Sequence, residues 1–362
     1  MNDADEQTCN RPPPRATSTT RGVASNPVNR FESIQVEPDP DWHDEDERPP
    51  RTEFIRDHSQ SIISYNDSPD LNFRASVNPY RGCEHGCVYC YARPTHEYAG
   101  MSEGLDFESK ILIKPEAPEL LRKELCAKKW KPQMIAMSGG TDCYQPVERK
   151  LRITRACLEV LAEARNPVGV ITKNDLVTRD IDLLSKLHEH KAAAVFISLT
   201  TLDPDLRKIM EPRTSPPKAR LKAIRKLADA GIPTGIMIAP AIPALNEPEI
   251  PALLEAAAEA GARHAALVPL RLPLGVADMF EAWLEDHFPA RKEKILNRIR
   301  EMRDGRMNDA NFGSRMKGLG VHVKQMHKIF EVACRKAGIN QEELALSTDS
   351  FRRPERDQLT FL

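Results

Sequence analysis

The sequence predicts an α/β fold in which a parallel sheet, covered by helices on its outer side, curves into a partly open barrel. From about residue 70, short apolar runs alternate with amphipathic stretches, a pattern typical of parallel strands joined by helical crossovers. The apolar runs are almost entirely hydrophobic, as expected for strands buried on both faces. About six strand–helix units can be counted, too few for a closed eight-fold barrel.

Seven apolar runs are the candidate strands. They cover residues 73–77, 111–113, 134–137, 168–172, 194–199, 234–239 and 265–269. Stretches with apolar residues at helical spacing lie between them and cover residues 116–130, 148–164, 179–190, 218–230 and 250–260. Gly231 and Gly261 directly follow the last two and mark their carboxyl ends. Folds of this kind carry their chemistry at the carboxyl ends of the strands.

Composition divides the chain into three regions. Residues 1–55 form an arm rich in proline and acidic residues, which we expect to be disordered because it buries too little apolar surface; residues 31–36 are a candidate docking segment. Residues 70–315 form the core domain, with one or two helices over 278–304. Residues 316–362 form a mixed C-terminal tail with a helix at 323–336.

Charge and hydropathy limit the classes of protein. The formal net charge of the 362 residues is −1, so no global field draws the protein to DNA or to a membrane. No apolar run approaches the ~18 residues of a membrane span, and the N-terminus has no secretory signal. We therefore expect a cytoplasmic protein without a membrane partner. A monomer or a weak dimer is a separate expectation.

Three of the eight cysteines fall within eight residues, with the spacing Cys83-x3-Cys87-x2-Cys90. In a reducing compartment such a group binds metal or does chemistry more often than it forms disulfides. Three neighbouring thiolates suit three corners of an iron–sulfur cluster and leave one iron free for a small molecule. The alternative is a zinc site, which needs a fourth ligand such as His85, His96 or Cys143, since no second Cys-x2-Cys pair is present.

The cysteine motif and its context resemble the radical SAM superfamily, and within it the branch related to spore photoproduct lyase. The resemblance covers residues 70–315. It is carried by the cysteine spacing, by an aromatic residue before Cys90, and by the segments Asn78–Cys83, Cys87–Ala92, Thr141–Glu148, Ile171–Asn174, Ser198–Thr201 and Glu211–Arg213.

This resemblance implies a partial (β/α)6 barrel, a [4Fe–4S] cluster on Cys83, Cys87 and Cys90, and S-adenosylmethionine (SAM) bound through the free iron. An electron from the reduced cluster, supplied by a donor such as flavodoxin or ferredoxin, would break the sulfonium C–S bond. The 5′-deoxyadenosyl radical formed would then take a hydrogen atom from the substrate.

The resemblance also implies which residues contact SAM. The turn after residues 134–137 contains Gly139, Gly140, Thr141 and Asp142 and resembles the glycine-rich motif that holds the SAM amine. Lys173 and Ser198 end two further strands and would reach the SAM carboxylate and ribose. The alternative for these positions is an ordinary turn or a polar cap after a strand.

Two further features bear on the substrate. Cys143 follows the glycine turn and is a candidate hydrogen-atom donor, although a small packing residue is the favoured interpretation. Residues 291–328 hold eleven Lys and Arg against four Asp and Glu, which fits either a nucleic-acid contact or a solvated helix face.

The sequence therefore predicts a radical SAM enzyme of unknown substrate. A lyase that acts on DNA lesions is one version of this hypothesis, and an enzyme that acts on a protein or tRNA is another. The alternative from a different class is a non-catalytic iron–sulfur or zinc-binding module.

Overall fold

The computed structural model describes residues 20–32 and 51–355. Its main sheet has seven strands. In spatial order these are β10 (His264–Pro269), β9 (Thr234–Ala241), β8 (Ala193–Ser198), β7 (Val168–Thr172), β6 (Ile135–Met137), β3 (Ala75–Val77) and β2 (Ile63–Tyr65). The first six run parallel, and β2 pairs with β3 in the antiparallel direction. No pairing joins β2 to β10 among the described residues, so the barrel is open, as predicted.

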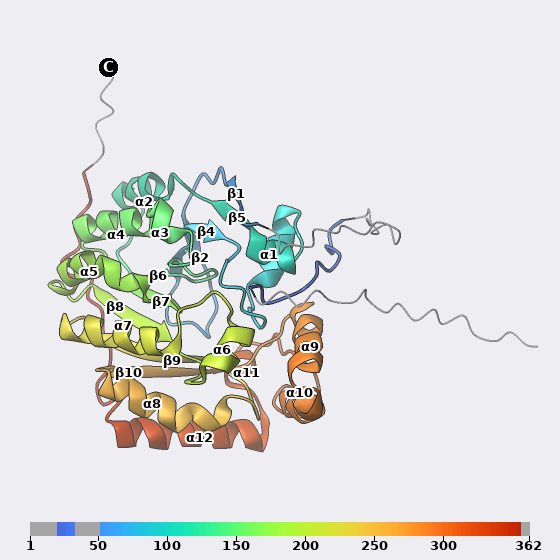
Figure 1. Cartoon of the computed structure of the whole chain (residues 1–362). Coiled ribbons are helices and arrows are strands. Elements are labelled where there is room, and N and C mark those ends of the chain that lie inside the picture. Colours follow the sequence, from blue (N-terminus) through green and yellow to red (C-terminus); the bar gives the residue numbers. More distant parts are fainter. Residues whose placement is uncertain (1–19, 33–50, 356–362) are drawn as a thin grey trace, which may run out of the picture.

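The crossover helices lie on the outer side of this sheet (Figure 1). They are α2 (Ala117–Cys126), α3 (Glu148–Leu151), α4 (Ile153–Ala164), α5 (Ile181–His188), α7 (Pro217–Asp229) and α8 (Ile250–Glu259). The short α6 (Pro204–Met210) instead lies near the strand ends and packs in a second apolar cluster (Figure 1). The apolar faces of α4, α5, α7 and α8 pack on buried strand residues and form one continuous core with them. The predicted helix at 148–164 is divided in two, because Arg152 has a left-handed backbone with φ of 55°.

One predicted strand belongs elsewhere. Residues 110–113 form β5 (Lys110–Ile113), which lies in a separate three-stranded sheet between β1 (Glu53–Arg56) and β4 (Tyr80–Arg81). The expectation that residues 111–113 join the barrel sheet was therefore wrong. After β3 the chain leaves the main sheet to form the cysteine loop, η1 (Arg93–Ala99) and α1 (Leu105–Ser109), and it returns to the main sheet only at β6.

The C-terminal part of the chain adds helices around the barrel. The predicted helical region 278–304 consists of α9 (Val276–His287) and α10 (Lys292–Glu301), which flank the end of the molecule near α1 and α6 (Figure 1). After α11 (Ser314–Lys317), the long α12 (Gly320–Ala337) packs along α8. None of the helices in the described part of the chain is long and apolar enough to cross a membrane.

Part of the predicted disordered arm lies against the domain. Residues 20–32 run beside η1 and α1, where Asn29 donates hydrogen bonds to the carbonyls of Glu97 and Met101, and Arg30 pairs with Glu97. Polar groups of the domain thus hold a segment whose own side chains are mostly polar. The composition of the segment does not show that it docks in this way. In the candidate docking segment 31–36, residues 33–36 lie outside the described residues.

Candidate functional site

The three clustered cysteines lie on one loop between β4 and η1. Gly82 and Gly86 in this loop have φ of 76° and 67°, backbone conformations that favour glycine, and they turn the chain tightly around the cysteines. Cys83 and Cys87 are buried and Cys90 is partly buried. The loop backbone is held by hydrogen bonds from the amides of Cys83 and Val88 to the carbonyls of Phe107 and Met210.

Charges around the three thiols act in opposite directions. Burial raises the pKa of each thiol. The charge of Asp142 and those of the other two cysteines raise the pKa of Cys83 further, and the charges of Glu211 and Cys90 raise that of Cys87. The cations of Lys173 and Arg93 lower the pKa of Cys90, and Lys173 also lowers that of Cys87. Three thiols that feel one another's charge, with two cations beside them, form a donor set that gains stability when a cationic metal cluster takes the place of the protons.

Arg93 anchors the cysteine loop from inside the protein. Its guanidinium is fully buried and donates two hydrogen bonds, of 3.1 and 2.9 Å, to the carbonyl of Cys87, and it pairs with the equally buried Glu108. The carboxylate of Glu108 also accepts hydrogen bonds from the amides of Gly22 (2.8 Å) and Val23 (3.2 Å). One buried ion pair therefore holds both the loop and the N-terminal segment that covers it.

The glycine turn after β6 lies against β3. The Asn78 side-chain oxygen accepts hydrogen bonds from the amides of Gly140 (2.8 Å) and Thr141 (3.4 Å), and the Thr141 hydroxyl donates to the carbonyl of Tyr80. Gly139 approaches β3 so closely that a Cβ there would lie 2.9 Å from the Ser76 side chain. The carbonyl of Gly139 accepts a hydrogen bond from the Tyr91 hydroxyl, which joins the glycine turn to the cysteine loop.

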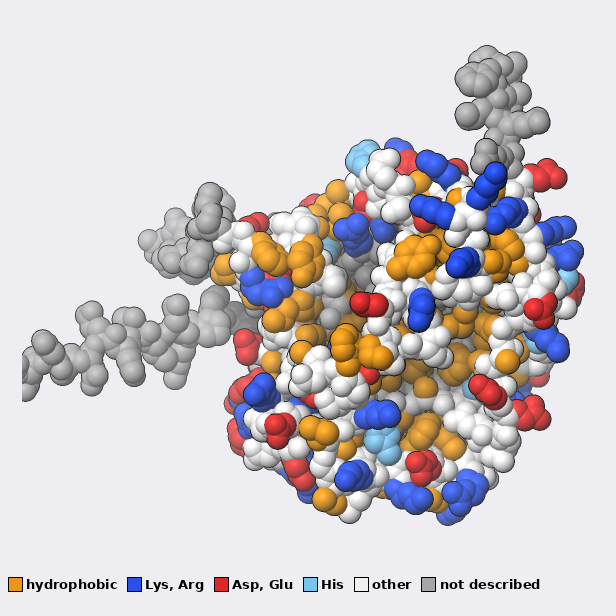
Figure 2. Space-filling model, turned by 180° about the vertical axis from the view of Figure 1, so that it is seen from behind, with side chains coloured by type: hydrophobic (Ala, Val, Ile, Leu, Met, Phe, Trp, Pro, Cys, Tyr) orange, Lys and Arg blue, Asp and Glu red, His pale blue; other side chains and the backbone are white. Residues whose placement is uncertain are grey.

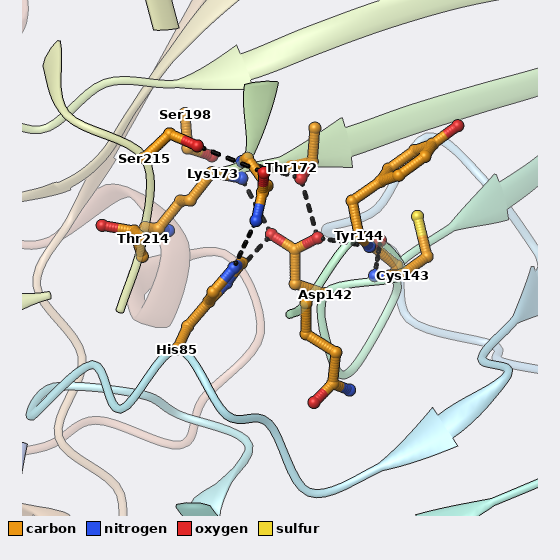
Figure 3. A network of polar contacts seen from close by, with 12 residues as sticks. His85, Asp142, Cys143, Tyr144, Thr172, Lys173, Ser198, Thr214 and Ser215 are labelled. Carbon is orange, nitrogen blue, oxygen red and sulfur yellow. Dashed lines mark hydrogen bonds and ion pairs between the residues drawn. The ribbon is translucent and has the colours of Figure 1, made fainter. Parts of the chain in front are cut away.

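Asp142 connects the cysteine loop with β7 (Figure 3). One of its oxygens accepts hydrogen bonds from Thr172 Oγ1 and the Tyr144 amide, and the other from the Lys173 amide, with His85 Nδ1 3.4 Å away. Burial alone would raise the pKa of Asp142, but the charge of His85 and these hydrogen bonds lower it to about 2. The carboxylate is thus an anion whose acceptor sites are occupied within the protein, which favours a positioning role over direct contact with SAM.

Lys173 and Ser198 stand at the ends of neighbouring strands. The Lys173 ammonium lies 5.8 Å from the ring centre of Tyr89 and 3.5 Å from the carbonyl of Ala239, so it points toward the cysteine loop across the strand ends. Ser198 is buried at the end of β8, and its carbonyl accepts a hydrogen bond from Arg220. Both residues lie on the same edge of the sheet as the glycine turn, where the sequence predicts them.

A second buried network supports the loop at Tyr89, two residues after Cys87. The Tyr89 hydroxyl donates to Glu211, which also pairs with the fully buried Arg220 and accepts a hydrogen bond from Thr200. Burial would raise the pKa of Glu211, but Arg220 and Lys173 together with the hydrogen bonds lower it to about 2. Glu211 is thus a fixed negative charge beneath the cysteine loop.

Cys143 lies apart from this group of residues. It is fully buried in the main core, and in Figure 3 its sulfur points away from the network of Asp142 and His85. Burial raises the pKa of its thiol well above the ordinary value. This position favours a packing role and gives no support to hydrogen-atom transfer by Cys143.

Sequence reasoning missed several residues that shape the site. Asn78, Arg93, Glu108 and Glu211 each hold a site loop, and His85 contacts Asp142 rather than standing as a metal ligand. The motif segments containing Asn78 and Glu211 were visible in the sequence, but their contacts were not. Glu108 had no local signal, because its partners Gly22 and Val23 are more than 80 residues away in the chain.

The residues present fit a cluster held by three thiolates. Three cysteines on a tight, anchored loop, two neighbouring cations and a glycine turn beside them supply the thiolate ligands and a polar edge for a bound cosubstrate. Among residues 20–32 and 51–355, no three His, Cys, Asp or Glu side chains gather closely enough to ligate one single metal ion.

The open barrel carries the cysteine loop and the glycine turn at its strand ends, the arrangement that the resemblance to the radical SAM superfamily implies. The family model of the radical SAM superfamily matches residues 77–257, half of the chain. The chain belongs to the radical SAM superfamily. Membership implies radical SAM chemistry, with a [4Fe–4S] cluster and SAM as the groups it requires.

Curated relatives share this part of the chain. An uncharacterised protein of Mycobacterium tuberculosis is 34% identical over 234 residues, which are 64% of this chain and 68% of the relative. An uncharacterised protein of Methanocaldococcus jannaschii is 28% identical over 199 residues, 55% of this chain and 71% of the relative.

Solved structures of spore photoproduct lyase share the fold. The structure of that enzyme complexed with dinucleoside spore photoproduct has a TM-score of 0.55 and 17% identity, and the match covers 78% of each chain. A variant with bound AdoMet and dinucleoside spore photoproduct has a TM-score of 0.53 at the same identity and coverage. At this identity the likeness concerns the fold.

Proposed function

We propose that this protein is a radical SAM enzyme whose [4Fe–4S] cluster is held by Cys83, Cys87 and Cys90. The observation that carries the proposal is the anchored loop that gathers three thiols beside the glycine turn and Lys173. When bound, the cluster and SAM supply the reductive cleavage that yields a 5′-deoxyadenosyl radical. A one-electron donor such as flavodoxin or ferredoxin is the expected partner.

The residues around the cysteine loop bind SAM, position the glycine turn and exclude water. Gly139, Gly140 and Thr141 present the edge of the glycine turn for the SAM amine, while Lys173 and Ser198 take the carboxylate and ribose. Asp142 positions this edge, because it holds the end of β7 and His85 of the cysteine loop at the same time. The buried Tyr89 covers the loop from the core side and excludes water.

The test is anaerobic. Reconstituted protein is reduced with dithionite and mixed with SAM, and 5′-deoxyadenosine is measured by mass spectrometry. We expect product from the wild type and none from Cys87→Ala. Cys334→Ala, a cysteine on the distant α12, is the matched control and should retain the product.

Two outcomes would contradict the proposal. One is undiminished 5′-deoxyadenosine formation by Cys87→Ala. The other is one zinc per chain without iron or sulfide, which would favour the non-catalytic metal-binding module.

A narrower version of the proposal is a lyase that acts on DNA lesions. Its support is the fold shared with spore photoproduct lyase, which has been solved with a dinucleoside spore photoproduct. This version predicts DNA binding that weakens steeply with salt. Absence of binding at low salt would remove it and leave the cluster assignment untouched.

The predicted basic run at 291–328 supports this version only in part. Lys292 pairs with Glu281 and Glu285, Arg298 pairs with Glu301, and Arg303 is fully buried. Figure 2 shows both basic and acidic side chains on the face seen from behind, with Lys and Arg most numerous in its upper right part. Five of the eleven cations of the run are thus paired with acidic neighbours or enclosed, namely Lys292, Arg298, Arg303, Arg315 and Lys328.

A further inference from the structure

An excess of positive charge is enclosed just after the last strand of the barrel. Arg271, Arg303 and Arg315 interact electrostatically there, and Arg303 is completely buried. The largely buried carboxylate of Asp70 lies beside them but is already used, because it pairs with Arg315 at 2.6 Å and accepts a hydrogen bond from the amide of Gly313. Enclosed cations cost free energy unless anions pair with them.

Arg303 and Arg315 have structural partners. Arg303 donates hydrogen bonds to the carbonyls of Ser314 (3.1 Å) and Arg315 (2.8 Å), among others, and so fixes the chain before α11. Arg315 binds Asp70 and lies over the ring of Phe312 at 4.4 Å. Their charges are needed to shape this part of the fold.

Arg271 has no comparable partner. Within residues 20–32 and 51–355 no carboxylate pairs with it, its Nε is buried without a hydrogen bond, and its Nη1 donates to the weak acceptor Sδ of Met316. Burial lowers the pKa of Arg271, and the neighbouring Arg315 lowers it further. A guanidinium in this state has donors available for an oxoanion.

Arg271 also lies next to the proposed site. Its guanidinium is 5.7 Å from the ring centre of Tyr91, the residue that follows Cys90, and the Tyr91 hydroxyl is bound to the carbonyl of Gly139. One aromatic ring therefore separates this cation from both the cysteine loop and the glycine turn. Tyr91 is half exposed, so the ring beside Arg271 is open to solvent.

We propose that Arg271 is an oxoanion-binding group beside the cysteine loop and the glycine turn and takes a phosphate group of the substrate. The role of Arg271 in substrate binding rests on the proposed function, whereas the binding of phosphate to Arg271 does not. The half-exposed ring of Tyr91 lies beside the position and suits a planar group attached to that phosphate, and the exposed ring of Phe312 lies under the neighbouring Arg315. Neither ring depends on the phosphate for its own contacts.

The probe is inorganic phosphate, titrated into the full-length reconstituted protein against sodium chloride of equal ionic strength while the melting temperature is followed. We expect a saturable rise for the wild type, because a ligand that binds only the native state stabilises it. Arg271→Gln should bind phosphate at least tenfold more weakly. Arg298→Gln removes an equal charge from an exposed, paired site and should match the wild type within twofold.

Arg271→Gln should fold, because it removes an enclosed charge without a carboxylate partner; Arg271→Lys provides a second variant that keeps the charge but loses the planar fork. Equal phosphate affinity in wild type and both variants would overturn the proposal. A second outcome would also overturn the proposal: Arg271→Gln binds phosphate like the wild type but loses the SAM-induced shift in the EPR signal of the cluster. Arg271 would then be a SAM-binding residue. Since the titration needs no SAM cleavage, its failure is distinct from failure of the proposed function.

Discussion

At the scale of single residues, the site depends on carboxylates that remain charged inside the protein. Glu211 and Asp142 each have a pKa of about 2, since cations and several hydrogen-bond donors surround them. Glu211 joins Tyr89 of the cysteine loop to Arg220 on α7, and Asp142 joins His85 of the same loop to the end of β7. Their charges therefore stabilise the arrangement of the loops as well as the fold.

The stability of the protein at low pH tests whether the charge of Glu211 stabilises the fold. Its pKa falls from an ordinary 4.5 to about 2 on folding, so its contribution is complete above pH 4.5 and is lost as the pH falls from about 4.5 to 2. We expect Glu211→Gln to lower the free energy of unfolding at pH 7 by about 3 kcal/mol. The variant should also lose the part of the acid dependence that belongs to this carboxylate.

Urea unfolding of the cluster-free protein between pH 2 and pH 7 measures both effects. Glu301→Gln, which removes the carboxylate of an exposed pair with Arg298, is the control and should cost less than about 1 kcal/mol. An unchanged acid profile in Glu211→Gln would mean that Glu211 does not carry its charge into the folded state.

At the scale of elements, the N-terminal segment 20–32 and the cysteine loop form one unit. Glu108 accepts hydrogen bonds from the amides of Gly22 and Val23 and pairs with Arg93, which holds the carbonyl of Cys87. Gly22 is in such close contact that a Cβ there would lie 1.6 Å from the carbonyl oxygen of Gly86. Only glycine fits at this contact.

Gly22→Ala should therefore displace the segment from the loop. We expect the cluster of this variant to lose iron to a chelator severalfold faster, as followed by its visible absorbance, and the segment to be cut sooner by trypsin at Arg30. Ser25→Ala changes an exposed side chain of the same segment and should behave as the wild type. Equal iron loss in Gly22→Ala and the wild type would show that the segment does not protect the loop.

At the scale of the whole molecule, the predicted C-terminal tail is part of the main core. Met326, Ala333 and Cys334 on α12 are buried together with residues of the barrel sheet and α8. A boundary near residue 315 follows the change in sequence pattern but cuts through this core. Removal of residues after 315 would expose the apolar face of α8.

Met326→Ala tests this packing without a truncation. Met326 is fully buried, so we expect its loss to cost about 2–5 kcal/mol of unfolding free energy. Val321→Ala on the exposed side of the same helix should cost no more than about 0.5 kcal/mol. Similar values for both variants in urea unfolding would show that α12 is not part of the cooperative core.

The sequence by itself determined much of this architecture. Six of the seven apolar runs form the parallel strands of the main sheet, because burial on both faces leaves a local hydrophobic pattern. The spacing of Cys83, Cys87 and Cys90 predicts a metal or cluster site, since this motif depends on a few adjacent residues. Local periodicity and short motifs record such properties directly.

The tertiary structure decided which groups meet. The Tyr89 and Glu211 side chains are in contact although they are 122 residues apart in the sequence. Arg271 reaches Tyr91 only because β10 ends near the cysteine loop. The same holds for β5, whose apolar residues fit a barrel strand but pair in the smaller sheet. Contacts of this kind follow from strand order and loop paths, which are set by the packing of the whole chain and leave no local pattern in the sequence.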